Sequence, residues 1–210
     1  MKDFSSWMET LPLVAILRGI KPEEVVDHAQ ALIDAGFNIL EVPLNSPDPF
    51  TSIRLLQEKF GDKTLIGAGT VVTREQLTEL VATGAKLMVS PNINVDLIKA
   101  AKVAGLYVFP GFFTASEAFA AMDAGADALK VFPAEAMTSP KVISAFCAVI
   151  PKSMKICPVG GVSPTTMQQY IDAGAQGFGL GSALYKAGQS VETTAQNAKA
   201  FADGWKAISK

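Results

Sequence analysis

The chain alternates between amphipathic stretches and short apolar runs, and the change repeatedly falls at a glycine. Five segments share this form: DAGFNILEV, ATGAKLMVS, VAGLYVFPG, DAGADALKV and DAGAQGFGL. Because glycine adopts a left-handed backbone without a Cβ clash, helices are predicted to end just before Gly36, Gly84, Gly105, Gly125 and Gly174. Each following run of about six residues is too short and too apolar for an amphipathic helix. These runs predict strands whose two faces are both covered.

The starts of the helices are marked by capping residues and prolines. TREQ from Thr73 and TASE from Thr114 are capping-box patterns, which satisfy free backbone N–H groups at a helix start. Pro22, Pro140 and Pro164 suit the first turn of a helix, where the missing N–H has no partner to lose. The pattern therefore predicts alternating βα units.

Three further apolar runs, at 13–17, 64–69 and 155–160, join the five that follow glycines, so eight strands are expected. Eight βα units favour a closed parallel barrel, the (β/α)8 TIM barrel of the α/β class, over a doubly wound sheet. Residues 3–11 are expected to form an extra N-terminal helix that covers the barrel floor. The chain has 210 residues and 49% hydrophobic content, which suits one core, so residues 1–210 are predicted to form a single domain.

Charge and composition exclude several kinds of partner. The 18 basic and 20 acidic residues are interspersed and give a net charge of −2, so neither nucleic acid nor a membrane surface is an expected partner. The chain start lacks a signal-peptide pattern and no apolar run approaches the roughly 20 residues of a membrane span, so a cytoplasmic location is expected. Cys147 and Cys157 are predicted to be reduced, buried thiols. His28 lies on a polar-rich helix and is expected to be solvated or capping, and no metal site is predicted.

In barrels of this kind the chemistry lies at the carboxyl ends of the strands. The residues expected there are mostly polar or glycine, and the candidates are Arg18, Glu41, Thr70, Pro91, Lys130, Gly160, Gly161, Gly181 and Ser182. Any one of them could simply terminate a strand. Three charged side chains directed into one mouth need a further reason, because burying charge is costly.

The segment GADALKVFPAE contains a lysine where a buried strand is expected. Strand alternation turns Leu129 and Val131 toward the helices and Lys130 inward. Burial lowers the pKa of an ammonium group, and a neutral amine can attack a ketone. The same alternation in FNILEV turns Glu41 inward, so a carboxylate is expected to move protons beside the amine. A permanent ion pair between Glu41 and Lys130 is the alternative interpretation.

Two glycine-rich segments follow the last two predicted strands, VGGVSP at 159–164 and GLGS at 179–182. Backbone N–H groups that no Cβ obstructs can bind an anion, and this is a frequent phosphate position in the barrel fold. Together the segments predict a phosphorylated substrate.

In order and spacing, ILRGI, LEVPLN, GAGTV, SPN, PG, LKVFPAE, PVGGV and GLGS resemble the class I aldolases that cleave 2-keto-3-deoxy-6-phospho-sugar acids, the KDPG/KHG aldolase family. The likeness runs from about residue 11 to the C-terminus. It implies that Lys130 forms a Schiff base with the keto carbon and that Glu41 carries protons through the cycle. The implied products are pyruvate and D-glyceraldehyde 3-phosphate. The iminium is the electron sink, so neither a metal nor an organic cofactor is implied.

The resemblance also implies roles for the other candidates. Arg18, Thr70 and the backbone at Pro91 are expected to contact the substrate carboxylate and the pyruvate end, although which anion Arg18 binds stays open. Phe132 would pack against the Schiff-base side chain. The phosphate would be held by Gly160, Gly161, Gly181 and Ser182. Family members are typically homotrimers, and the resemblance implies the same here.

Two positions separate branches of this family. Gluconate-type members resemble E-V-T-L-R and P-T-G-G, where this chain has EVPLN from Glu41 and PVGG, with Val159 in place of the threonine. Both replacements are similar to the galactonate branch, which implies 2-dehydro-3-deoxy-6-phospho-D-galactonate as the preferred substrate. A gluconate-type or broad-specificity KDPG/KHG aldolase, a phosphate-binding isomerase barrel and a non-catalytic phospho-sugar binder are the other interpretations.

Overall fold

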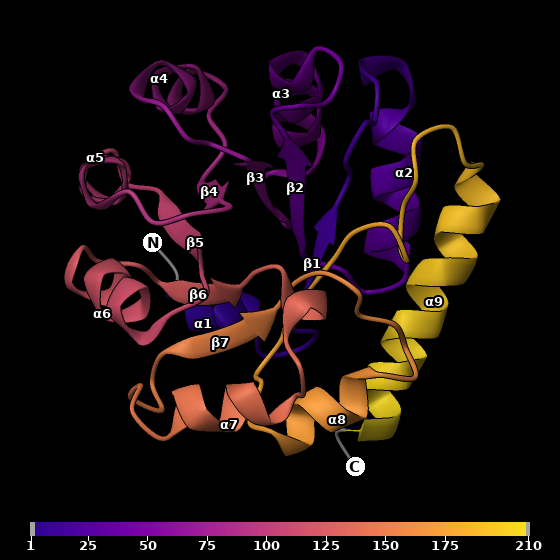
Figure 1. Cartoon of the computed structure of the whole chain (residues 1–210). Coiled ribbons are helices and arrows are strands. Elements are labelled where there is room, and N and C mark those ends of the chain that lie inside the picture. Colours follow the sequence, from indigo (N-terminus) through magenta and orange to yellow (C-terminus); the bar gives the residue numbers. More distant parts are fainter. Residues whose placement is uncertain (1–2, 209–210) are drawn as a thin grey trace.

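The computed structural model describes residues 3–208, which form a parallel barrel with helices packed around its outside (Figure 1). The strands neighbour one another in the order β7-β6-β5-β4-β3-β2-β1-β8, and a parallel bridge between Val159 and Gly179 joins the two ends of this order. The predicted (β/α)8 fold is therefore confirmed. The strand bounds are β1 Leu13–Ile16, β2 Ile39–Pro43, β3 Leu65–Gly69, β4 Leu87–Ser90, β5 Tyr107–Phe112, β6 Ala128–Val131, β7 Lys155–Pro158 and β8 Phe178–Leu180.

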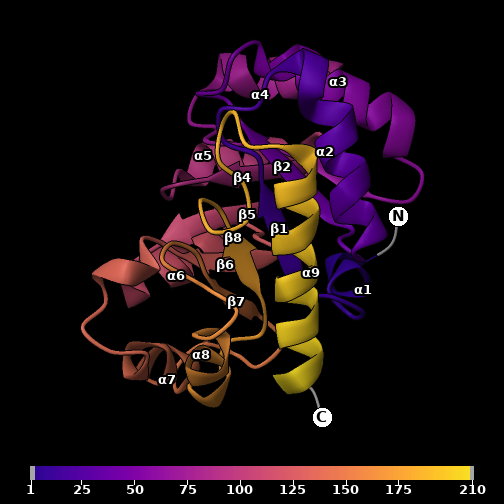
Figure 2. The ribbon, with the colours of Figure 1, turned by 90° about the vertical axis from the view of Figure 1, so that its right-hand side faces the viewer.

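Helices alternate with these strands along the chain. Their bounds are α1 Phe4–Trp7, α2 Pro22–Asp34, α3 Pro49–Phe60, α4 Arg74–Ala82, α5 Val95–Val103, α6 Ala115–Asp123, α7 Lys141–Cys147, α8 Met167–Asp172 and α9 Val191–Ile208. A short 3-10 helix, Ala134–Ala136, follows β6. The long α9 runs along the outside of the barrel and packs beside α2 (Figure 2). Among residues 3–208, no helix combines the length and the hydropathy that a membrane span requires.

Local sequence signals set most of the helix ends. The five predicted helix-ending glycines all have a positive φ, between 78° and 105°. At the other end of two helices, the side-chain oxygens of Thr73 and Thr114 accept hydrogen bonds from the backbone N–H groups of Gln76 and Glu117, at 3.2 and 3.3 Å. Both predicted capping boxes are confirmed. These contacts hold each strand at a defined position in its βα unit.

One predicted helix start is wrong. Pro22 begins α2 and Pro140 is the residue just before α7, but Pro164 lies in a turn and α8 begins only at Met167. The backbone N–H of Ser163 donates to Thr166 Oγ1 at 2.9 Å. The N–H groups of Thr166 and Met167 both donate to the Ser163 carbonyl, at 3.0 and 3.2 Å, so residues 163–167 form a turn that leads into α8.

The lower part of the barrel is filled by apolar side chains. They form one cluster: Phe4, Met8, Val14, Ile39, Leu65, Leu87, Val89, Tyr107, Phe109, Ala128 and Cys157. The expected helix at the floor is present but shorter than predicted, Phe4–Trp7 rather than 3–11. Its Phe4 ring lies 5.7 Å from the ring of Tyr107, centroid to centroid. The amino end of the barrel is therefore closed, and the opposite end is free for a ligand.

Two expectations about single side chains are corrected. His28 is buried, not solvated: its Nδ1 lies 2.8 Å from Thr194 Oγ1 and its ring packs edge to face on Tyr185 at 5.0 Å. The cause is long-range, because α9 and the segment after β8 cover this side of α2. Cys157 is buried as predicted, but Cys147 is only partly buried.

Candidate active site

Lys130 points into the barrel from β6. In the register of the sheet it lies between Gly111 of β5 and Cys157 of β7, and only 5% of its surface is exposed. Ala128, two residues earlier, belongs to the apolar cluster inside the barrel. The alternation predicted from the sequence therefore puts an amine at the carboxyl end of the packed interior.

The surroundings of Lys130 favour its neutral form. Burial lowers the pKa of Lys130, and the guanidinium of Arg18 lowers it further, while the carboxyl of Glu41 acts in the opposite direction. Within residues 3–208, no carboxylate lies within 4.0 Å of Nζ. Nζ lies instead over the ring of Phe132, 4.5 Å from its centroid. A direct Glu41–Lys130 ion pair is thus absent, and the amine is not held by a permanent partner.

Glu41 points inward from β2, four strands away from β6 in the sheet order. It is 2% exposed, and its buried Oε2 has no hydrogen-bond partner among the described residues. Burial raises the pKa of Glu41, and the charges of Lys130 and Arg18 oppose this shift. The carboxyl occupies space that Gly69 leaves free, since a Cβ at that position would lie 2.6 Å from Glu41 Cδ and collide with Oε2. The result is a buried carboxyl that can hold a proton.

A cavity of about 700 Å³ opens at this end of the barrel. Every residue predicted to bind substrate lines it: Arg18, Thr70, Pro91, Phe132, Val159, Gly160, Gly161, Gly181 and Ser182. Lys130 and Glu41 are buried and are not part of its wall. Phe132 connects the two regions, because its ring lines the cavity and also lies against the Lys130 amine.

The wall of the cavity carries two basic side chains, Arg18 and Lys186. Arg18 donates from Nη1 to Asn45 Oδ1 at 2.7 Å, and the backbone N–H of its neighbour Gly19 donates to Ser46 Oγ at 2.9 Å. These two bonds tie the loop after β1 to the loop after β2. Thr70, on the same wall, has a left-handed backbone with φ of 59°, which is uncommon for a β-branched residue. A strained residue of this type is often retained at a functional site.

Another part of the wall offers backbone N–H donors. Gly160 and Gly161 have φ values of 108° and 68°, which only glycine adopts easily. No hydrogen bond within residues 3–208 uses the backbone N–H groups of Gly161, Ser182 or Ala183. Consecutive free N–H groups of this kind can bind an anion.

Sequence reasoning missed part of the wall. Glu135, Tyr185 and Lys186 also line the cavity. A signal for each was present, because Glu135 ends the segment LKVFPAE and the other two follow GLGS directly in the segment ALYKA. Asn45, the hydrogen-bond partner of Arg18, entered the sequence analysis only as the residue that stands where gluconate-type members have the arginine of E-V-T-L-R. Among residues 3–208, no group of three His, Cys, Asp or Glu side chains is arranged to hold a metal ion.

The structure is a parallel (β/α)8 barrel in which the Lys130 amine and the Glu41 carboxyl are buried near the C-terminal ends of the strands. Such a site defines a class of barrels equipped for covalent chemistry on a carbonyl. Comparison with known families narrows this class. The chain belongs to the KDPG and KHG aldolase family, whose pattern matches residues 4–199.

The relatives of this chain include proteins named as phosphogalactonate aldolases and proteins named as KHG/KDPG aldolases. The chain is 51% identical to the 2-dehydro-3-deoxy-6-phosphogalactonate aldolase of Escherichia coli strain K12, over 95% of this chain and 97% of that protein. It is 34% identical to the KHG/KDPG aldolase of the same strain, over 81% of each chain. A solved structure described as native KDPGal superimposes with a TM-score of 0.93 at 51% identity and covers 95% of this chain and 96% of that one.

Proposed function

We propose that this protein is a class I aldolase, a carbon–carbon lyase that cleaves 2-dehydro-3-deoxy-6-phospho-D-galactonate to pyruvate and D-glyceraldehyde 3-phosphate. The observation that carries the proposal is the Lys130 amine, which is buried, has a lowered pKa and lies within 4.5 Å of a ring that lines the cavity. An amine that is neutral more often than an exposed lysine can act as a nucleophile without a metal or an organic cofactor.

The reaction follows from the two buried groups. Nζ of Lys130 attacks the C2 carbonyl, and loss of water from the adduct gives an iminium. Removal of the C4 hydroxyl proton then breaks the C3–C4 bond: the aldehyde leaves, and the bonding electron pair moves into an enamine on Lys130. Protonation at C3 and hydrolysis release pyruvate and the free amine. Glu41, whose pKa is raised by burial, is the group that we assign to these proton transfers.

The cavity suits a substrate with an anion at each end. We assign the free N–H groups of Gly161 and Ser182, with Gly160 and Gly181, to the phosphate. Arg18 and Thr70, with the backbone at Pro91, are assigned to the carboxylate and pyruvate end. These assignments are supported by the shared cavity, by the Arg18 guanidinium in its wall and by the free N–H groups of Gly161 and Ser182.

The galactonate configuration is favoured by the nature of one wall residue. Val159 lines the cavity and offers no hydroxyl, so a substrate hydroxyl directed at it would lose a hydrogen bond that a threonine could supply. The higher identity to the galactonate-named relative, 51% against 34%, supports the same substrate. Measuring kcat/KM for the gluconate and galactonate epimers tests this part of the proposal, and equal values would contradict it.

Borohydride reduction in the presence of pyruvate tests the covalent step. A stable adduct should form and map to the peptide that contains Lys130. Lys186 also lines the cavity and is the matched control, since the Lys186→Gln variant should still be modified at Lys130. An isomerase barrel or a non-catalytic binder would give no adduct. Absence of an adduct at Lys130 would therefore contradict the aldolase proposal.

The proposal extends to the context of the enzyme. We infer a single functional domain, a homotrimer and a cytoplasmic location, each on the basis of the family resemblance and the sequence patterns. Sedimentation analysis of the purified chain tests the trimer, because a monomer at micromolar concentration would contradict it.

A further inference from the structure

The segment between β8 and α9 forms a large share of the cavity wall. We call residues 181–187 the cavity loop, and its members that line the cavity are Gly181, Ser182, Ala183, Tyr185, Lys186 and Ala187. The loop begins with one tight turn, in which the N–H groups of Leu184 and Tyr185 both donate to the Gly181 carbonyl, at 2.8 and 2.9 Å. The free N–H groups of Ser182 and Ala183 lie within this turn, so their directions depend on how the loop is held.

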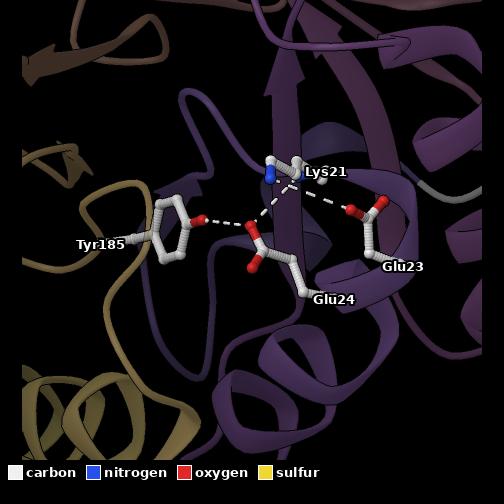
Figure 3. Close-up of polar contacts among 4 residues, drawn as sticks. All are labelled: Lys21, Glu23, Glu24 and Tyr185. Carbon is white, nitrogen blue, oxygen red and sulfur yellow. Dashed lines mark hydrogen bonds and ion pairs between the residues drawn. The ribbon is translucent and has the colours of Figure 1, made fainter.

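Tyr185 fastens the cavity loop to a different part of the barrel. It lines the cavity, yet it is only 2% exposed, and its hydroxyl donates to Oε1 of Glu24 on α2 at 3.1 Å. Figure 3 shows this bond bridging two segments that are far apart in the sequence. Burial and the Glu24 carboxylate both raise the pKa of Tyr185, so the hydroxyl remains a donor at neutral pH.

The Glu24 carboxylate is also held by a contact within its own helix start. The same Oε1 accepts a hydrogen bond from the backbone N–H of Lys21, the residue just before α2, at 3.2 Å (Figure 3). Glu24 therefore accepts the Tyr185 hydrogen bond from a fixed position in the first turn of α2. The neighbouring pair Lys21–Glu23, at 4.0 Å, is largely solvent-exposed, and in Figure 3 the hydroxyl of Tyr185 is bonded to Glu24 and not to this pair.

A second set of contacts holds the middle of the cavity loop. The carbonyl of Leu184 accepts from Gln189 Nε2 and from Asn197 Nδ2 of α9, both at 3.0 Å. Gln189 Nε2 also donates to Thr194 Oγ1, which lies 2.8 Å from His28 Nδ1. These contacts secure the backbone at Leu184 from the α9 side. Two side-chain contacts join Tyr185 of the cavity wall directly to α2, the hydrogen bond to Glu24 and the edge-to-face packing on His28, and the hydrogen bond is the one that depends on the Tyr185 hydroxyl.

We propose that Tyr185 and Glu24 are positioning residues whose hydrogen bond holds the cavity loop in the shape that binds the phosphate of the substrate. The proposal rests on the phosphate assignment made under the proposed function. Neither residue is given a chemical step. The bond acts on the Ser182 and Ala183 N–H groups, which lie two or three residues from Tyr185.

A set of four variants isolates the bond. Tyr185→Phe removes only the hydroxyl, and Glu24→Ala removes the acceptor. Glu24→Gln keeps an oxygen that can accept from both Tyr185 and Lys21, so it should restore the behaviour of the unaltered protein. Glu23→Ala is the matched control on the same turn of α2, because it removes an exposed charge without touching the loop.

The kinetic readout compares the phosphorylated substrate with the same sugar acid lacking its phosphate. Loss of a hydrogen bond to a carboxylate should raise KM for the phosphorylated substrate by about three- to tenfold in Tyr185→Phe and Glu24→Ala, with kcat changed by less than about twofold. The substrate without phosphate should be unaffected. Equal losses for both substrates, an unchanged KM, or a Glu24→Gln variant as impaired as Glu24→Ala would overturn the proposal.

Two further measurements separate this proposal from the proposed function. Pyruvate trapping by borohydride should be the same in Tyr185→Phe and in the unaltered protein, since the phosphate loop is not needed to bind pyruvate. Binding of inorganic phosphate should be weaker in Tyr185→Phe, and this measurement needs no catalysis. Absence of trapping in the unaltered protein would refute the aldolase alone, whereas equal phosphate binding in both proteins would refute the role of Tyr185.

Discussion

A methyl group added at Gly69, in the Gly69→Ala variant, should lower catalysis far more than it lowers stability. Oε2 of Glu41 has no hydrogen-bond partner in the part of the chain that the structure describes, so the space beside Gly69 helps to define the position of the carboxyl group. In a Gly69→Ala variant the new Cβ would lie 2.6 Å from Glu41 Cδ if nothing moved. Carbon atoms prefer to be about 3.5 Å apart and the new Cβ would lie closer still to Oε2, so the carboxyl must shift by about 1 Å or more.

The size of the effect follows from this displacement. A general acid–base group contributes about 10²- to 10⁴-fold to a rate, and a misplacement of about 1 Å can cost about 10²-fold. We therefore expect kcat for cleavage to fall by about 100-fold. Overpacking of the interior should also lower the free energy of unfolding, by about 1–3 kcal/mol.

The assay must show that the loss is catalytic. Exchange of the pyruvate methyl protons with deuterated solvent, followed by NMR, reports the proton transfer, and urea unfolding reports stability. Gly105→Ala is the control, because its φ of 78° strains an alanine while no atom lies within 4 Å of the new Cβ. It should lower stability by about 1 kcal/mol and leave exchange unchanged. If Gly69→Ala exchanged protons within threefold of the unaltered rate, the location assigned to the catalytic carboxyl would be wrong.

Three other variants test the charges and the selectivity of the cavity. Because the charge of Glu41 raises the pKa of Lys130 and that of Arg18 lowers it, Glu41→Gln should move the rising limb of the pH profile for pyruvate trapping to lower pH, and Arg18→Gln should move it to higher pH; shifts in the same direction would contradict the reasoning. Val159→Thr should raise the gluconate-to-galactonate ratio of kcat/KM by about tenfold or more, and an unchanged ratio would remove the valine from substrate selection. Asn45→Ala frees the Arg18 guanidinium from its 2.7 Å bond and should raise KM about three- to tenfold at constant kcat, which steady-state kinetics would detect.

The fold could be predicted because its signals are local. A helix-ending glycine or a capping threonine acts within one turn of the chain, and these residues recur often enough to reveal the βα repeat. The inward direction of Lys130 was predictable for the same reason, since strand alternation has a period of two. Pro164 shows the limit of this reasoning, because it lies in a turn that precedes α8 and not in the helix itself.

The parts that sequence reasoning missed depend on contacts between distant segments. His28 is separated from Thr194 by 166 positions and Tyr185 from Glu24 by 161, and no local pattern indicates either pair. A polar-rich helix predicts a solvated histidine, and only the docking of α9 on α2 buries it. The glycines of GLGS therefore predicted that the start of the cavity loop binds phosphate. They did not predict that a buried tyrosine holds this loop against α2.

The two buried groups of the site are best understood together. Burial lowers the pKa of Lys130 and raises that of Glu41, so it favours the neutral form of both, and their mutual attraction opposes each shift. The neutral pair and the charged pair carry the same number of protons and differ only in where one proton resides. Burial therefore favours moving that proton from the amine to the carboxyl, which would free the amine that we propose as nucleophile and protonate the carboxyl that we propose as acid. Because no carboxylate of residues 3–208 lies within 4.0 Å of the amine, the direct ion pair that would reverse this transfer is not formed. We therefore expect the proposed nucleophile and the proposed acid to be available at the same pH.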